Sequence, residues 1–313
     1  MLTIIKKQAK RLSNYHFPGN DNNIFLFSSP RSGSTWLMEL ILTQPGFKPC
    51  NEPFDLRIPR VREQLQKFGI FDWGDYHNEN SHQKIEKYIN ELLRGKINIA
   101  TPSPHKYYFR LITNKIIFKI LHAAEDKVEW FSNTFNGHVL FLVRHPIPVS
   151  LSRTECPRLD TFLNTKYIEN FSKELIYYSK KLRKSGNRLE LLVLDWCLQN
   201  AIHLQSKKKK RALVFYENLV LNPKPVIETL SKKLCLLYPH RMYKRLGVAS
   251  RTTNQSDEQT KKVLNLGRNQ NINKWLVEKW KDKINIDQEK KLMEIVENFG
   301  ISQYQLGSTT PCE

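Results

Sequence analysis

A short turn rich in hydroxyl groups follows the apolar run at 24–27. The residues of this turn that could contact a ligand are Arg31, Ser32, Gly33, Ser34 and Thr35. A helix that begins at the carboxyl end of a parallel strand offers unpaired N–H groups to an anion. The glycine allows the backbone to approach a ligand closely, and the arginine adds a permanently charged fork. We interpret the turn as an anion-binding loop; the alternative is that Ser34 is only a helix N-cap.

A second charged residue, Arg144, ends the apolar run at 139–143. A charge beside a buried strand is unfavourable unless it faces a ligand or a carboxylate. Pro146 then begins a helical segment after His145, and the start of that segment again offers N–H groups to an anion. The pattern indicates a second anion site, and the alternative for Arg144 is an internal salt bridge.

These two motifs need a scaffold of strands and helices to position them. Short runs rich in β-branched and aromatic residues occur at 24–27, 116–121, 139–143 and 212–216. Helical patterns occur at 34–42, 81–93, 167–182, 191–204, 225–236 and 287–299. Strands buried on both faces that alternate with helices predict an α/β fold, a single P-loop-like domain whose central parallel sheet has about five strands.

The domain organisation follows from the same patterns. We expect a basic N-terminal tail at 1–20, one folded domain at 21–304 and a C-terminal tail at 305–313. The lysine-rich run at 207–211 is expected to be a solvated loop, and the polar stretch at 251–259 a mobile one.

Composition limits the possible partners and the compartment. The chain has 313 residues and a formal charge of +20, which favours an anionic partner. Its five cysteines are widely spaced and include no C-x-x-C pair, so neither a disulfide framework nor a zinc site is expected. No apolar stretch approaches the roughly 18 residues of a membrane span, and the first apolar run is too short for a signal peptide. We expect a soluble, cytoplasmic protein without a transmembrane segment.

The anion-binding loop lacks the features of kinase and hydrolase loops. No Gly-Lys pair precedes Ser34, and no strand ends in an aspartate placed to organise magnesium. Trp36 also breaks the spacing of a nucleophile elbow. The loop therefore fits a nucleotide that is bound without metal chemistry.

Four stretches between about residues 24 and 300 resemble, in order, motifs of the sulfotransferases that use 3′-phosphoadenylyl sulfate (PAPS) as sulfuryl donor. SSPRSGSTWL resembles their 5′-phosphosulfate loop, and FLVRHPIPVSLSR their 3′-phosphate motif, in which Arg144 precedes Ser152 by eight positions. FYENLVLNP resembles their tyrosine-glutamate strand end. NINKWL, with Arg268 upstream, is a looser match to the loop that closes over the cofactor. The resemblance implies that the two anion sites hold the two ends of one PAPS molecule and that no metal takes part.

Two aromatic residues are placed near the cofactor by the same resemblance. Trp36 would stack on the adenine, and Tyr216 would lie near it with its ring or hydroxyl. The alternative for both is ordinary core packing. Glu217 is expected to anchor the local backbone rather than to touch substrate.

Sulfuryl transfer needs a base for the acceptor hydroxyl and positive charge for the leaving phosphate. Arg31 supplies the charge, and Lys119 could assist it. The resemblance implies Glu52 as the base, because carbohydrate-type and tyrosyl-protein-type sulfotransferases carry a glutamate at the corresponding place. His122 is the rival, since cytosolic small-molecule sulfotransferases use a histidine. The alternative for Glu52 is a structural ion pair with a neighbouring arginine.

The acceptor is left open among a sugar, a tyrosyl group, a lipid headgroup and a phenol, and an anionic glycan or peptide is among the candidates. Segments 58–101 and 154–188 are expected to build its pocket. Two other functions stay open: a nucleotide-kinase-like phosphotransferase, which would require magnesium, and a non-catalytic basic module that binds polyanions without nucleotide preference. No nucleic-acid partner is expected, and the oligomeric state is left open.

Overall fold

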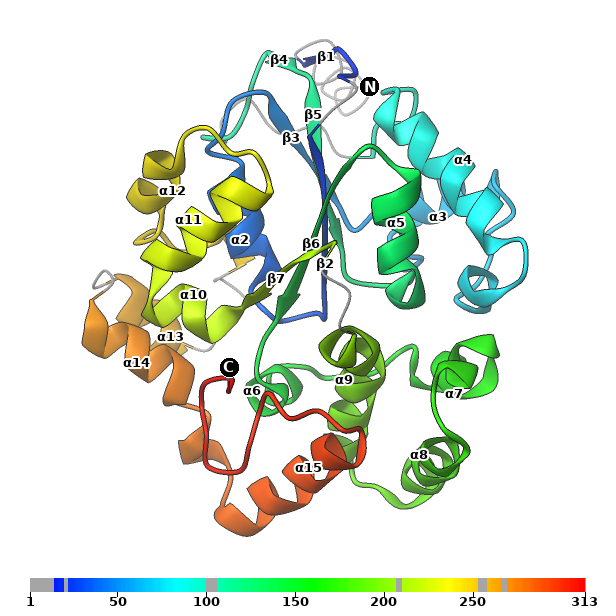
Figure 1. Cartoon of the computed structure of the whole chain (residues 1–313), viewed down its shortest axis with the longest axis vertical. Coiled ribbons are helices and arrows are strands. Elements are labelled where there is room, and N and C mark those ends of the chain that lie inside the picture. The colour runs from blue at the N-terminus through cyan, green and yellow to red at the C-terminus, as the bar shows by residue number, and fades with distance from the viewer. Residues whose placement is uncertain are drawn as a thin grey trace.

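The computed structural model describes residues 14–19, 22–99, 106–206, 210–252, 258–265 and 269–312. At its centre lies a five-stranded sheet in which every neighbouring pair is parallel (Figure 1). The strands in spatial order are β3 (Phe47–Asn51), β5 (Lys115–Ile120), β2 (Asn23–Ser28), β6 (Gly137–Val143) and β7 (Ala212–Phe215). In the central strand, Leu26 lies opposite Lys119 of β5 and Leu140 of β6. The prediction of an α/β fold with a five-stranded parallel sheet is confirmed.

Strand β3 is the one strand of the central sheet that the sequence patterns did not locate. Its residues, FKPCN, include a proline, which the inner strands β5, β2 and β6 lack, and no continuous apolar run. Proline cannot donate to a sheet, and it is tolerated here because β3 is an edge strand that pairs only with β5. Lys48 is nevertheless buried, and burial lowers its pKa to about 8.

The sheet separates two hydrophobic clusters, because side chains alternate between its faces along each strand. Along β2, Ile24 and Leu26 belong to one cluster and Phe25 and Phe27 to the other. Figure 1 shows α2, α10, α11 and α12 on the first side of the sheet and α3, α4 and α5 on the second. The α-helices are α2 (Ser34–Ile41), α3 (Pro59–Gln66), α4 (Ser81–Leu93), α5 (Val128–Thr134), α6 (Pro146–Leu151), α7 (Leu159–Asn164), α8 (Lys173–Ser185), α9 (Arg188–Gln205), α10 (Tyr216–Leu221), α11 (Pro223–Lys233), α12 (Pro239–Arg245), α13 (Glu258–Asn265), α14 (Gln270–Glu278) and α15 (Ile286–Asn298).

Two predicted elements differ from the structure for local reasons. The single helix expected at 167–182 is a 3-10 helix (Lys166–Asn170) followed by α8. The Ser172 hydroxyl accepts a hydrogen bond from Leu175 N at 3.3 Å, and this cap begins a new helix. Tyr216, expected at a strand end, is the first residue of α10.

The lysine-rich run is not a fully solvated loop. Residues 207–209 lie outside the described residues, but Arg211 is buried. Its guanidinium donates a hydrogen bond to the backbone carbonyl of His203 in α9. The expectation of a solvated loop is therefore wrong for Arg211, because this side chain satisfies a helix-end carbonyl instead.

The polar stretch at 251–259 begins with an anchored residue. Arg251 N donates to Glu39 Oε1 at 3.2 Å, and its guanidinium donates to Asn51 Oδ1 at 2.5 Å. Helix α13 begins at Glu258, and residues 253–257 lie outside the described residues. The start of the stretch is thus anchored to Glu39 of α2 and to Asn51 of β3.

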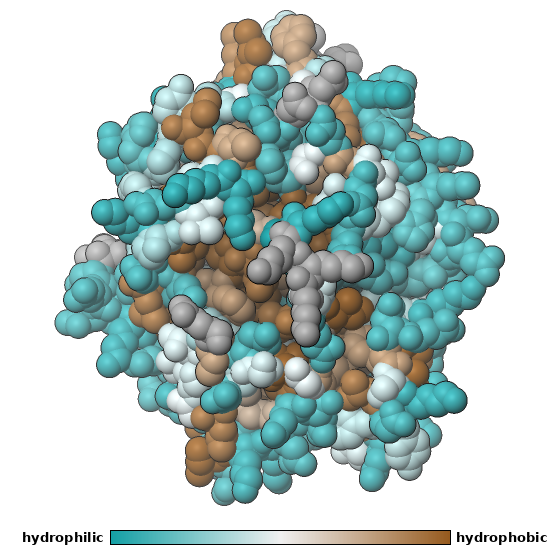
Figure 2. Space-filling view, viewed as in Figure 1, coloured by the Kyte–Doolittle hydropathy of each residue, from teal (hydrophilic) through white to brown (hydrophobic). Residues whose placement is uncertain are grey.

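Both predicted tails contact the rest of the chain. In a small parallel ribbon, β1 (Tyr15–His16) pairs with β4 (Ile112–Thr113). Exposed apolar side chains gather there, and Figure 2 shows hydrophobic residues at that end of a mostly hydrophilic face. Near the other end of the chain, Gly307 N donates to Glu289 Oε1 at 2.6 Å. The boundaries at 20 and 304 stay predictions. Within the described chain, no helix is long and apolar enough to cross a membrane.

Candidate active site

A cavity of about 620 Å³ lies beyond the carboxyl ends of the strands. Of the predicted site residues, those that line it are Arg31, Gly33, Ser34, Thr35, Trp36, Glu52, Lys119, His122, Arg144, Ser152 and Tyr216. Ser32 does not line the cavity; its hydroxyl is fully buried and has no hydrogen-bond partner among the described residues. Arg268 lies outside the described residues. Residues predicted from five separate stretches of sequence thus meet in one place.

The turn after β2 has the geometry of an anion-binding loop. Gly33 caps α2 with a left-handed φ of 91°, and a Cβ built on it would lie 2.6 Å from the ring of Tyr216. Glycine is therefore required both by the backbone conformation and by the contact with Tyr216. Ser34 and Thr35 form the first turn of α2, where backbone N–H groups have no partner within the helix.

Arg144 follows β6 and reaches the same loop. Its guanidinium donates to the backbone carbonyl of Arg31 at 3.2 Å and lies over the Tyr216 ring at 4.4 Å. Burial, followed by the charge of Arg144, lowers the pKa of Arg31, so two cations lie close together at this part of the cavity. No carboxylate forms a salt bridge with Arg144 in the part of the chain that the structure describes, which disfavours the internal salt bridge.

The segment from Arg144 to Ser152 is held from behind by buried contacts. The Glu217 carboxylate accepts hydrogen bonds from His145 N at 2.8 Å and from the Tyr304 hydroxyl at 3.0 Å. Glu217 therefore anchors the backbone between β6 and α6, as expected. Ser152 ends α6, and its hydroxyl lies at the cavity while donating to Val149 O at 2.8 Å.

Three predicted residues, Glu52, Lys119 and Thr35, are linked by an ion pair and a hydrogen bond on the other side of β2. Lys119 Nζ, on β5, lies 2.8 Å from Glu52 Oε1 and donates to Thr35 Oγ1 at 3.1 Å. Lys119 is only 3% exposed, and burial lowers its pKa. The Glu52 side chain is 23% exposed and lines the cavity. The ion pair of Glu52 is thus with Lys119, not with a neighbouring arginine, and it links the carboxylate to the anion-binding loop.

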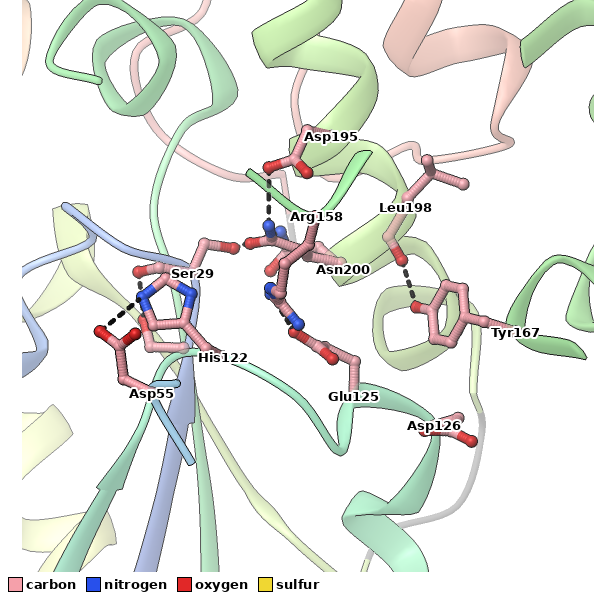
Figure 3. Close-up of polar contacts among 12 residues, drawn as sticks. Ser29, Asp55, His122, Glu125, Asp126, Arg158, Tyr167, Asp195, Leu198 and Asn200 are labelled. Carbon is pink, nitrogen blue, oxygen red and sulfur yellow. Dashed lines mark hydrogen bonds and ion pairs between the residues drawn. The ribbon is translucent and has the colours of Figure 1, made fainter. Parts of the chain in front are cut away.

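His122 lies beside Lys119 and Glu52, but its imidazole is neutral. Arg57 NH2 lies 2.7 Å from His122 Nε2, and a guanidinium can only donate, so Nε2 is an unprotonated acceptor. Burial, followed by the charges of nearby arginines, lowers the pKa of His122 well below its ordinary value. Figure 3 shows the imidazole beside Asp55, whose Oδ2 lies 3.8 Å from Nε2. A neutral imidazole whose lone pair is already engaged is a poor base.

Asp55 and Arg57 are functional candidates that the sequence patterns did not select. Asp55 accepts two hydrogen bonds from the Arg57 guanidinium, at 2.9 and 2.8 Å. Their closeness to Glu52 in sequence was the only available signal. Glu52, Asp55 and His122 bring three possible metal ligands together. Each already has a cationic partner, Lys119 for Glu52 and Arg57 for the other two, so this donor set does not suit a metal ion.

A buried polar network lies behind the site (Figure 3). Arg158 pairs with Glu125, and Arg153, next to Ser152, pairs with Asp195 at 2.5 Å. Asn200 Nδ2 donates to the hydroxyl of Ser29 at 2.7 Å, so the network reaches the start of the anion-binding loop. These long-range pairs connect α9 to both anion motifs and hold them in place.

Comparisons with known proteins give distant structural similarities only. No family model matches the chain, and neither does any curated protein. The structure is similar to the sulfotransferase domain of the Synechococcus PCC 7002 olefin synthase (17% identity, 93% of this chain and 97% of that one, TM-score 0.44). It is also similar to the sulfotransferase domain from the curacin biosynthetic pathway (18%, 93% and 100%, TM-score 0.47). A third similar structure is mouse sulfotransferase SULT7A1 complexed with PAP (17%, 90% and 86%, TM-score 0.41). All three TM-scores lie below 0.5, so a functional assignment has to come from the site itself.

Proposed function

We propose that this protein is a PAPS-dependent sulfotransferase that acts on a hydroxyl acceptor. The observation that carries the proposal is the meeting of two guanidinium-bearing anion motifs in one cavity, with a carboxylate beside them. Arg144 touches the backbone of Arg31, so the two motifs are close enough to hold one ligand. The cavity volume of about 620 Å³ lies in the range of small-molecule sites.

The strand order divides the cavity into a cofactor side and an acceptor side. β6, with Arg144, lies on one side of β2, and β5 and β3, with Lys119 and Glu52, lie on the other. We assign the 5′-phosphosulfate to the N-terminus of α2, the 3′-phosphate to Arg144 and Ser152, and the adenine to the neighbourhood of Trp36 and Tyr216. The acceptor hydroxyl then approaches from the β5–β3 side.

Glu52 is the base that this arrangement favours. In the proposed step, Glu52 takes the proton of the acceptor hydroxyl while the acceptor oxygen bonds to sulfur. The bond from sulfur to the 5′-phosphate oxygen breaks, which gives a sulfate ester and adenosine 3′,5′-bisphosphate. Arg31, Lys119 and the N–H groups of α2 stabilise the charge that develops on the leaving phosphate. His122 is a weaker candidate because its lone pair already accepts from Arg57.

Nucleotide binding tests the proposal directly. Thermal shift and calorimetry should show tighter binding of adenosine 3′,5′-bisphosphate than of ADP or AMP, without added magnesium. Arg144→Ala should reduce that preference by about 10- to 150-fold, because a charge-assisted hydrogen bond contributes about 1.5–3 kcal/mol. Glu52→Gln should keep the affinity and lower sulfuryl transfer by about 10²–10⁴-fold. Equal binding of ADP, or a magnesium requirement, would refute the proposal.

A further inference from the structure

We propose that Arg57 binds an anionic group of the acceptor. The acceptor would then be a hydroxyl compound that carries a carboxylate, phosphate or sulfate near the reacting hydroxyl. This inference rests on the proposed sulfotransferase function and specifies its substrate class.

The position of Arg57 places it on the acceptor side of the cavity. It follows β3, the edge strand farthest from β6 and β7, and it lines the cavity with Glu52, Lys119 and His122. The anion motifs that we assign to the cofactor lie on β2 and β6. Arg57 is therefore a permanent cation next to the proposed base and away from the 3′-phosphate motif.

Arg57 is held rigidly even though it is exposed. Its Nε and NH2 donate to Asp55, and its NH2 also donates to His122. Both partners are buried, with 4% and 5% of their side chains exposed, while the Arg57 side chain is 48% exposed. Two buried partners therefore fix one edge of the guanidinium, while about half of the side chain stays accessible and the residue lines the cavity.

The hydrogen bonds of Arg57 leave one edge of its fork available. A guanidinium has five N–H donors, and Asp55 and His122 accept from the donors on Nε and NH2. The two donors on NH1 have no partner among the described residues. A fixed pair of donors on a permanent cation suits a carboxylate, phosphate or sulfate oxygen.

Related acceptors with and without an anionic group test this inference. Glucose would be compared with glucuronate, glucose 6-phosphate and glucose 6-sulfate, and N-acetyltyrosine amide with N-acetyltyrosine, by transfer of labelled sulfuryl from PAPS. We expect kcat/KM to be at least tenfold higher for an anionic member, and the comparison within the glucose series identifies which anion is preferred. Arg57→Gln should raise KM for the anionic member by about 10- to 150-fold and change the neutral member by less than about threefold.

Arg60→Gln is the matched control, because Arg60 is exposed in α3 and does not line the cavity. It makes the same change of charge three residues away and should leave the preference intact. If no member is sulfated, calorimetry on protein saturated with adenosine 3′,5′-bisphosphate should show the same preference in binding and its loss in Arg57→Gln.

The outcomes separate this inference from the proposed function. A wild-type protein that binds the bisphosphate but shows no anion preference overturns the role of Arg57 alone. Equal losses for anionic and neutral members in Arg57→Gln also overturn it, because they indicate a purely structural arginine. A wild-type protein that does not select the bisphosphate over ADP refutes the sulfotransferase proposal itself.

Discussion

The ion pair between Glu52 and Lys119 should respond very differently to the loss of each partner. Lys119 is 3% exposed, whereas the Glu52 side chain is 23% exposed. Glu52→Gln leaves a buried ammonium without its anionic partner, beside only neutral acceptors such as the Thr35 hydroxyl and the new amide oxygen. Lys119→Met removes the buried charge, fills a similar volume and leaves a carboxylate that water can reach. We therefore expect Glu52→Gln to destabilise the fold by about 3–5 kcal/mol and Lys119→Met by about 1 kcal/mol.

The destabilisation expected for Glu52→Gln cannot exceed the free energy needed to remove the proton from Lys119. A lysine with an ordinary pKa of 10.5 loses its proton at pH 7 at a cost of about 4.8 kcal/mol, from 3.5 units at 1.36 kcal/mol each. The same cost is about 2 kcal/mol at pH 9. In Glu52→Gln the folded protein binds fewer protons at Lys119 than the unfolded chain does below pH 10.5, so its stability rises with pH. The deficit relative to wild type should therefore shrink toward about 2 kcal/mol at pH 9.

Urea unfolding at constant ionic strength measures this effect. The six tryptophans provide a fluorescence signal, and equal m-values across the variants would support two-state comparison. Equal free-energy losses for Glu52→Gln and Lys119→Met, or a Glu52→Gln deficit that does not change between pH 7 and pH 9, would refute the account of a stranded buried lysine.

Two other predictions concern the anion-binding loop and the buried histidines. Gly33→Ala should weaken binding of adenosine 3′,5′-bisphosphate at least tenfold in calorimetry, because the left-handed φ costs about 1–2 kcal/mol and the new Cβ meets the Tyr216 ring. Gly46→Ala is the control, because Gly46 also has a left-handed φ (+81°) but does not line the cavity. This variant should lower stability and keep the affinity. Burial lowers the pKa of His145 to about 3, so urea unfolding should show stability falling by about 2 kcal/mol for this residue between pH 6.5 and pH 5, as the unfolded chain takes up the proton. His145→Asn should remove this part of the pH-dependent loss of stability. His240→Gln, at an exposed position, should not.

Local sequence was sufficient to predict the inner part of the sheet and the shared location of the two arginine-bearing segments that follow it. The inner strands β2 and β6 are continuous apolar runs, and each is followed at once by its polar motif. Because the carboxyl ends of parallel strands lie at one edge, locating the strands also brought Arg31 and Arg144 together. Tyr216 begins a helix and packs against Gly33 and Arg144, and its predicted place near the adenine stays a prediction.

The acceptor side was harder to predict, because its contacts are set by tertiary structure. Arg57 and His122 are 65 positions apart in sequence, and nothing in either local pattern indicates their 2.7 Å contact. Edge strand β3 lacks an apolar run, so the position of Glu52 at its end could come only from the family resemblance. The buried state of Arg211 likewise depends on α9, not on the lysines before it.

Backbone strain at the site was equally hidden from the sequence. Left-handed φ values occur at Arg31 (72°), Glu52 (49°), Ala123 (73°) and Ala124 (61°), which follow β2, β3 and β5. Each such residue costs about 1–2 kcal/mol, and glycine would remove the cost at any of them. At 31 and 52, however, glycine would delete the guanidinium and the carboxylate that the proposed chemistry needs. The strain persists there because the surrounding sheet and hydrogen bonds fix the backbone, and it is concentrated at the edge of the sheet where ligand binding requires particular side chains.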